Sequence, residues 1–187
     1  MDSEEMKYSR MEYERRFLVS PQSDWRSSIE SYSKTYEDKY LRSSRLRLRI
    51  LTDNDTGRRV IKLNKKYESD SPYFRVISRI LLSPGEYLLL KNLEGDHLCK
   101  TRYYHRFGER VFSIDVFDGE LEGLILCETE TESLDELMSV EPPPYVDREV
   151  TGDSFFQGGH LCKITRAELV THLETPDLRA QDTYART

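Results

Sequence analysis

Two pairs of glutamates have a spacing that could hold a cation, Glu12 with Glu14 near the start and Glu128 with Glu130 far downstream. Because alternate residues of a β-strand share one face, each pair directs two carboxylates toward the same place. Residues 45–50 alternate arginine with leucine or isoleucine and present three guanidinium groups in the same way. Carboxylate oxygens bind hard divalent cations, and fixed cations bind phosphate. The patterns predict a site for a metal-chelated polyphosphate.

Each pattern alone also fits an ordinary amphipathic strand whose charged side chains face water. The segments taken together favour a different interpretation, because the first and last ones carry acidic pairs while those between carry basic residues. The basic residues that alternate in this way are Arg47, Arg49, Lys62, Lys66, Arg75, Arg79, Lys100 and Arg102. Solvated faces usually mix their signs. The segregation therefore predicts a lumen with a basic wall and an acidic corner.

The composition favours a single polar globular domain over residues 1–187, with a core at about 11–174 and mobile ends at 1–10 and 176–187. The net charge of −6 argues against general nucleic-acid binding. No stretch approaches the roughly 18 apolar residues of a membrane span. Three widely spaced cysteines fit a reducing compartment. We expect a cytoplasmic protein with neither nucleic acid nor a membrane as partner.

The elements that must position these residues are mainly strands. Alternation and β-branched or aromatic residues between turn signals predict eight strands, at about 11–19, 35–41, 44–51, 58–67, 73–82, 97–107, 110–117 and 124–132. Capping residues and apolar spacing predict helices at about 23–33, 84–92 and 133–140, and over most of 153–174. The fold class is α+β, mainly β, and eight antiparallel strands are about enough to close a β-barrel around one small ligand.

Five separated segments resemble, in order and spacing, the motifs of the CYTH family, also called triphosphate tunnel metalloenzymes. Residues 11–19 resemble its ExExK signature, and the later motifs are similar to residues 46–49, 100–103, 114–119 and 128–130. Residues 142–151 resemble the bacterial, inorganic triphosphatase-like branch. The resemblance covers roughly residues 11–162 and implies a closed eight-stranded tunnel with a charged lumen. Family members hydrolyse inorganic, thiamine or nucleoside triphosphates, or cyclise ATP, with Mg²⁺ or Mn²⁺.

The resemblance also implies roles for individual residues. The catalytic group would be Glu12, Glu14, Arg16 and Glu130. The metal ligands would be Glu12, Glu14, Asp115, Glu128 and Glu130, with Asp115 supporting either the metal or a basic neighbour. The phosphates would be bound by Arg47, Arg49, Lys62, Lys66, Arg75, Lys100 and Arg102. A β-bulge would change which of Lys62, Lys65 and Lys66 faces inward.

Two departures from the family pattern affect the functional hypotheses. Arg16 stands where the signature has lysine, and residues 153–159 lack the usual basic closing segment. Phe155 and Phe156 in that segment would either offer an aromatic surface to an organic group or pack in a core. Three hypotheses remain: a divalent-metal-dependent triphosphatase acting on inorganic triphosphate or a triphosphorylated small molecule, a class IV-type adenylate cyclase, and a non-catalytic polyphosphate- or nucleotide-binding module. The two complete carboxylate pairs favour the enzyme. A homodimer is left open.

Overall fold

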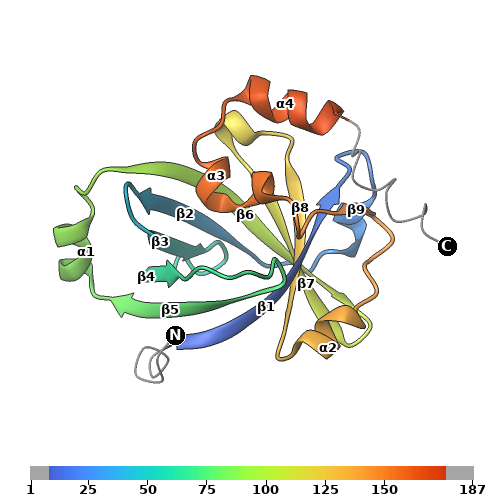
Figure 1. The fold of residues 1–187 in the computed structure, drawn as a ribbon, viewed down its shortest axis with the longest axis horizontal. Coiled ribbons are helices and arrows are strands. Elements are labelled where there is room, and N and C mark those ends of the chain that lie inside the picture. The colour runs from blue at the N-terminus through green and yellow to red at the C-terminus, as the bar shows by residue number, and fades with distance from the viewer. Residues whose placement is uncertain (1–8, 176–187) are drawn as a thin grey trace.

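The computed structural model describes residues 9–175, which form a closed antiparallel β-barrel with a few flanking helices (Figure 1). Eight strands pair in the order β5-β4-β3-β2-β6-β7-β8-β1, and pairing of β1 with β5 closes the barrel. A ninth strand, β9, continues the edge of β1 beyond β5. The predicted fold class is confirmed. The strands are β1 (Ser9–Val19), β2 (Ser33–Leu41), β3 (Leu46–Asp53), β4 (Arg59–Lys66), β5 (Phe74–Leu82), β6 (Gly95–Phe107), β7 (Arg110–Phe117), β8 (Ile125–Thr131) and β9 (Val146–Glu149).

The eight barrel strands begin and end within two residues of their predicted limits. Ser9 and Arg10, which were expected in a mobile arm, instead belong to β1 and pair with Ser78 and Ile77 of β5. Residues 1–8 and 176–187, also expected to be mobile, lie outside the described residues. Strand β9 was not predicted, because it is only four residues long and has no apolar run of its own.

The helices are short and lie outside the sheet. They are α1 (Pro84–Leu90), α2 (Leu134–Met138), α3 (Gly158–Leu161) and α4 (Arg166–Glu174), with 3₁₀ turns η1 (Trp25–Ser28), η2 (Gly119–Leu121) and η3 (Ser154–Phe156). The Ser83 and Ser133 side chains cap α1 and α2, as predicted. The helix predicted at 23–33 is reduced to η1, because only Trp25 of that turn is buried. No helix within residues 9–175 is long and apolar enough to cross a membrane.

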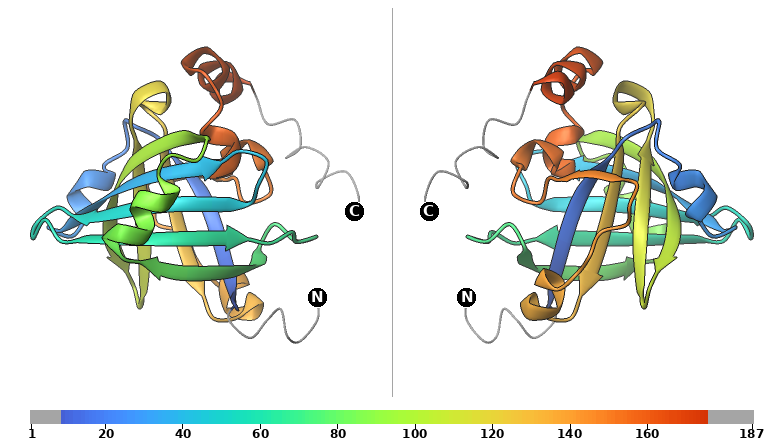
Figure 2. Two further views of the ribbon diagram at one scale, coloured as in Figure 1. Left: turned by 90° about the vertical axis from the view of Figure 1, so that its left-hand side faces the viewer. Right: turned by 90° about the vertical axis from the view of Figure 1, so that its right-hand side faces the viewer.

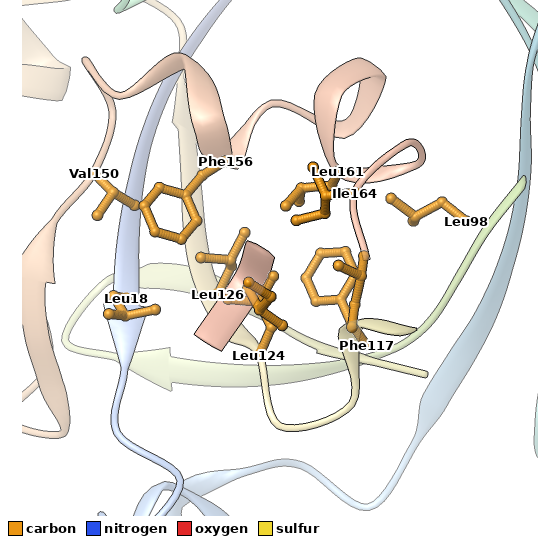
Figure 3. Packing of buried hydrophobic residues seen from close by; sticks show 11 residues of the cluster. Leu18, Leu98, Phe117, Leu124, Leu126, Val150, Phe156, Leu161 and Ile164 are labelled. Carbon is orange, nitrogen blue, oxygen red and sulfur yellow. The ribbon is translucent and has the colours of Figure 1, made fainter. Parts of the chain in front are cut away.

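The barrel interior is polar along most of its length and apolar at one end. At that end the inward faces of four strands carry Leu18, Leu98, Phe117 and Leu126 instead of charged residues. These side chains pack against Phe156 and other apolar residues of the C-terminal segment, so that an apolar plug forms (Figure 3). Figure 1 shows α3 and α4 together at this end of the barrel. The plug excludes water from one end and leaves the polar section as the place for a ligand.

A second apolar cluster covers the outer face of the barrel. Phe17, Ile114 and Cys127 point outward from β1, β7 and β8 and are at most 1% exposed. Trp25 of η1 and Tyr145, which precedes β9, cover them. Figure 2 shows η1 against this outer face. Because the outward side chains supply this core, the inward side chains of the same strands can be charged.

We expect His105 of β6 to make the stability of the barrel depend on pH. Its Nδ1 lies 2.8 Å from the buried Tyr145 hydroxyl. Burial lowers the pKa of His105, although nearby Glu30 opposes this. Below the usual histidine pKa of about 6.5, the unfolded chain therefore binds a proton that the folded chain does not. The free energy of unfolding consequently decreases as the pH is lowered. We expect His105→Gln to flatten the dependence between pH 7.5 and 5.5, measured by urea unfolding. Parallel pH profiles for the two proteins would contradict this assignment.

Candidate active site

A cavity of 430 Å³ occupies the polar section of the barrel. Among residues 9–175, eleven Lys and Arg side chains and five Asp and Glu side chains line it, and β7 and β9 contribute none of them. Every predicted site residue except Asp115 lines the cavity. The sequence left open which lysines of β4 face the cavity. Lys62 and Lys66 face inward. Lys65 is exposed on the outer face, where its ammonium lies 4.6 Å from the centre of the Tyr67 ring.

The acidic corner lies where β1 pairs with β8. Glu14 stands directly opposite Glu130, and Arg16 stands opposite Glu128. The Arg16 guanidinium donates to Glu128 Oε1 at 2.7 Å, to the Phe156 carbonyl at 3.1 Å, and to Glu14. Burial alone would lower the pKa of Arg16, but Glu14 and Glu128 raise it. A lysine ammonium could not make these three contacts in the same geometry, because it lacks the planar fork of arginine.

Glu128 connects this corner to the basic wall. Its second oxygen, Oε2, accepts a hydrogen bond from Arg102 at 2.6 Å. Burial would raise the pKa of Glu128, but Arg16, Lys100 and Arg102 hold it well below the usual range. The carboxylate is therefore ionised at neutral pH and fixes two guanidinium groups that face the cavity.

Asp115 of β7 lies behind the cavity wall. Its side chain is 0% exposed, and it accepts two hydrogen bonds of 2.6 Å from Arg102 and one from Lys100. The predicted role as a metal ligand does not fit this placement, because the carboxylate oxygens are occupied and do not reach the cavity. Its alternative role, support of a basic neighbour, agrees with these contacts.

The inward face of β2 contributes residues that the sequence interpretation missed. Asp38 is 2% exposed and accepts hydrogen bonds of 2.5 and 2.6 Å from Arg49. Burial would raise the pKa of Asp38, but Arg49 and Arg47 lower it. The Tyr36 ring lies under the same wall, 4.6 Å from the Arg49 guanidinium. The sequence feature that could have identified them is the alternation of Tyr36, Asp38 and Tyr40. The same kind of alternation predicted the inward-facing residues of the other strands.

The carboxylates of β1 and β8 provide oxygen donors for a divalent cation. Within residues 9–175, no three His, Cys, Asp or Glu side chains are arranged to hold a metal as they stand. Among the carboxylates of this corner, Glu12 Oε2 pairs with the Lys66 ammonium at 2.8 Å. Burial and repulsion from Glu12 and Glu14 raise the pKa of Glu130. Several carboxylates gathered at one place are the oxygen ligands that a hard divalent cation prefers.

The C-terminal segment closes the cavity without offering a free aromatic surface. Phe156 is 1% exposed within the apolar plug, and the Phe155 ring stacks on His172 at 3.6 Å between centroids. Of the two predicted roles for these phenylalanines, packing in a core agrees with the structure. At Gly158 an added Cβ would lie 2.0 Å from the Tyr40 hydroxyl. Glycine there allows the segment to approach the barrel wall closely.

Known proteins similar to this chain share both its sequence and its fold. An inorganic triphosphatase of Nitrosomonas europaea is 30% identical over 162 residues, covering 81% of this chain and 96% of the relative. An inorganic triphosphatase of Acetivibrio thermocellus is 35% identical over 74 residues, covering 36% of this chain and 46% of the relative. A crystal structure of an inorganic triphosphatase matches with a TM-score of 0.53 and 25% identity, covering 81% of this chain and 93% of that one. No protein-family model matches the chain.

Proposed function

This chain belongs to the CYTH family of triphosphate tunnel enzymes, and on that premise we propose that it hydrolyses inorganic triphosphate with a bound divalent cation. The observation that carries the proposal is the segregation of charge in the cavity. Carboxylates gather on β1 and β8, whereas basic side chains cover β3 to β6. A metal-chelated anion needs both surfaces at once.

The basic wall supplies charge neutralisation for the phosphates. Triphosphate carries about four negative charges, and phosphoryl transfer depends mostly on positioning and charge stabilisation. Cations fixed in a shielded cavity stabilise a developing charge without having to reorganise. Asp38 and Asp115 hold the wall in place through their contacts with Arg49, Lys100 and Arg102. The residues proposed to bind phosphate oxygens are Arg47, Arg49, Lys62, Lys66, Arg75, Lys100 and Arg102.

The acidic corner supplies the remaining groups. Glu12, Glu14 and Glu130, with Glu128 beside them, are the residues that would hold Mg²⁺ or Mn²⁺. Such a cation polarises a phosphate and lowers the pKa of bound water. Glu130 is the proposed acceptor for a proton of the attacking water, because its side chain is the most exposed of these four carboxylates. Arg16 holds the Glu14 and Glu128 carboxylates at their positions.

The direct test is phosphate release from inorganic triphosphate, thiamine triphosphate and nucleoside triphosphates, with the products separated. We expect inorganic triphosphate to be the best substrate, giving one phosphate and one pyrophosphate per turnover. Activity should vanish on chelation and return with Mg²⁺ or Mn²⁺. Formation of cyclic AMP from ATP would instead support the cyclase, and triphosphate binding without turnover would support the binding module.

A further inference from the structure

The cations of the cavity differ in whether the protein already neutralises them. Carboxylates are in direct contact with Arg16, Arg49, Lys66, Lys100 and Arg102. By contrast, Lys62, Arg75 and Arg79 line the cavity and form no ion pair within residues 9–175. The electrostatic attraction for an anionic ligand is therefore strongest near these three side chains, on β4 and β5.

Arg79 belongs to a row of polar residues that crosses three strands. Arg47 of β3 stands opposite Asn64 of β4, and Asn64 stands opposite Arg79 of β5. Lys62 is two residues from Asn64 on the same strand face. All four side chains line the cavity. In the order of the strands, this wall lies across the barrel from β7 and β8.

Two atoms in this row lack partners although they are buried. Asn64 is 4% exposed, and among residues 9–175 its Oδ1 has no hydrogen-bond partner, nor does the Nε of neighbouring Arg47. Buried polar groups in native proteins are nearly always hydrogen-bonded. Two neighbouring buried atoms without a hydrogen bond therefore indicate a missing ligand. Because the oxygen and nitrogen of an amide are assigned from their partners, Asn64 can present its NH₂ group instead. It would then donate to a phosphate oxygen.

We propose that Arg47, Asn64 and Arg79, with Lys62, form a subsite for one terminal phosphate of the substrate. A terminal phosphate has three free oxygens and needs donors from several directions, which a row across three strands provides. Burial and nearby cations lower the pKa of both Lys62 and Arg79, with Arg79 acting on Lys62 and Arg10 on Arg79, and a bound anion relieves this repulsion. The subsite rests on the proposed function and deepens it. It assigns one end of a linear inorganic polyphosphate to the β3–β5 wall.

The test is calorimetric titration of inorganic triphosphate and of pyrophosphate in the presence of chelator, so that turnover does not interfere. We expect Arg79→Gln to weaken triphosphate binding about tenfold and Asn64→Ala about fivefold, as for loss of a hydrogen bond to a charged group. Pyrophosphate should be weakened as well, because it too has a terminal phosphate that can enter this subsite. Lys65→Gln is the matched control, since it removes the same charge from the outer face of β4.

Unchanged triphosphate binding in Arg79→Gln would overturn the subsite, as would an equal loss of triphosphate binding in the Lys65→Gln control. The outcome is separable from that of the proposed function. If the wild-type protein binds triphosphate without hydrolysing it, and Arg79→Gln weakens that binding, the hydrolase fails and the subsite stands. If the wild-type protein hydrolyses triphosphate and Arg79→Gln binds it normally, the subsite fails and the hydrolase stands.

Discussion

Replacing Glu128 by glutamine is expected to lower kcat/KM for inorganic triphosphate by about a hundredfold or more, the usual effect of removing a preorganised electrostatic contact. The substitution keeps the size of the side chain but removes its charge. Arg16 and Arg102, which donate to its two oxygens at 2.7 and 2.6 Å, would lose their shared anchor. Both guanidinium groups face the cavity, so their displacement disturbs the acidic corner and the basic wall together.

Steady-state kinetics at several Mn²⁺ concentrations would separate the two contributions of Glu128. If the carboxylate contacts the cation, activity of the variant should recover partly as Mn²⁺ rises. If it acts only by holding the two arginines, KM for triphosphate should rise and Mn²⁺ should have no effect. Glu132→Gln is the control, because Glu132 is exposed just beyond the end of β8. Activity equal to that of the wild type would remove Glu128 from the site.

The strands were predictable because partial alternation, β-branched or aromatic residues and the turn signals between them are local properties of the sequence. The positions of Glu12 and Glu14 followed directly, since a two-residue spacing fixes a shared face whatever the neighbouring strand is. The choice between Lys65 and Lys66 was not accessible in this way. It depended on whether β4 continues without a bulge, and the unbroken pairing with β3 and β5 shows that it does.

Which charges neutralise one another could not be predicted, because it depends on register between strands distant in sequence. Asp115 stands opposite Arg102 only because β6 pairs with β7 in that register, and Asp38 stands opposite Arg49 for the same kind of reason. The surroundings of Phe156 are equally non-local. Its burial requires the inward leucines and phenylalanine at the ends of four separate strands, which no single segment reveals.

The charge cluster around Asp115 leads to the largest expected effect on stability. Asp115 is fully buried, and its partners Lys100 and Arg102 are 9% and 13% exposed. Removing one member of a buried ion pair typically costs about 3–5 kcal/mol, because the remaining charge stays buried without compensation. We therefore expect Asp115→Asn to lower Tm by roughly 2–4 °C for each kcal/mol lost, measured by thermal unfolding. High salt should not reduce the difference, since buried pairs are poorly screened.

Asp147→Asn is the matched control, because the ion pair of Asp147 with Arg148 is 3.4 Å long and half exposed. Exposed pairs contribute about 0–1 kcal/mol, so its Tm should barely change. Adding Lys100→Met to Asp115→Asn should restore part of the lost stability, because the double variant removes one uncompensated cation and replaces it with an apolar side chain. If Asp115→Asn unfolds like the control, the cluster does not stabilise the barrel. Asp115 would then act only by orienting Arg102, and its loss would appear in KM for triphosphate rather than in Tm.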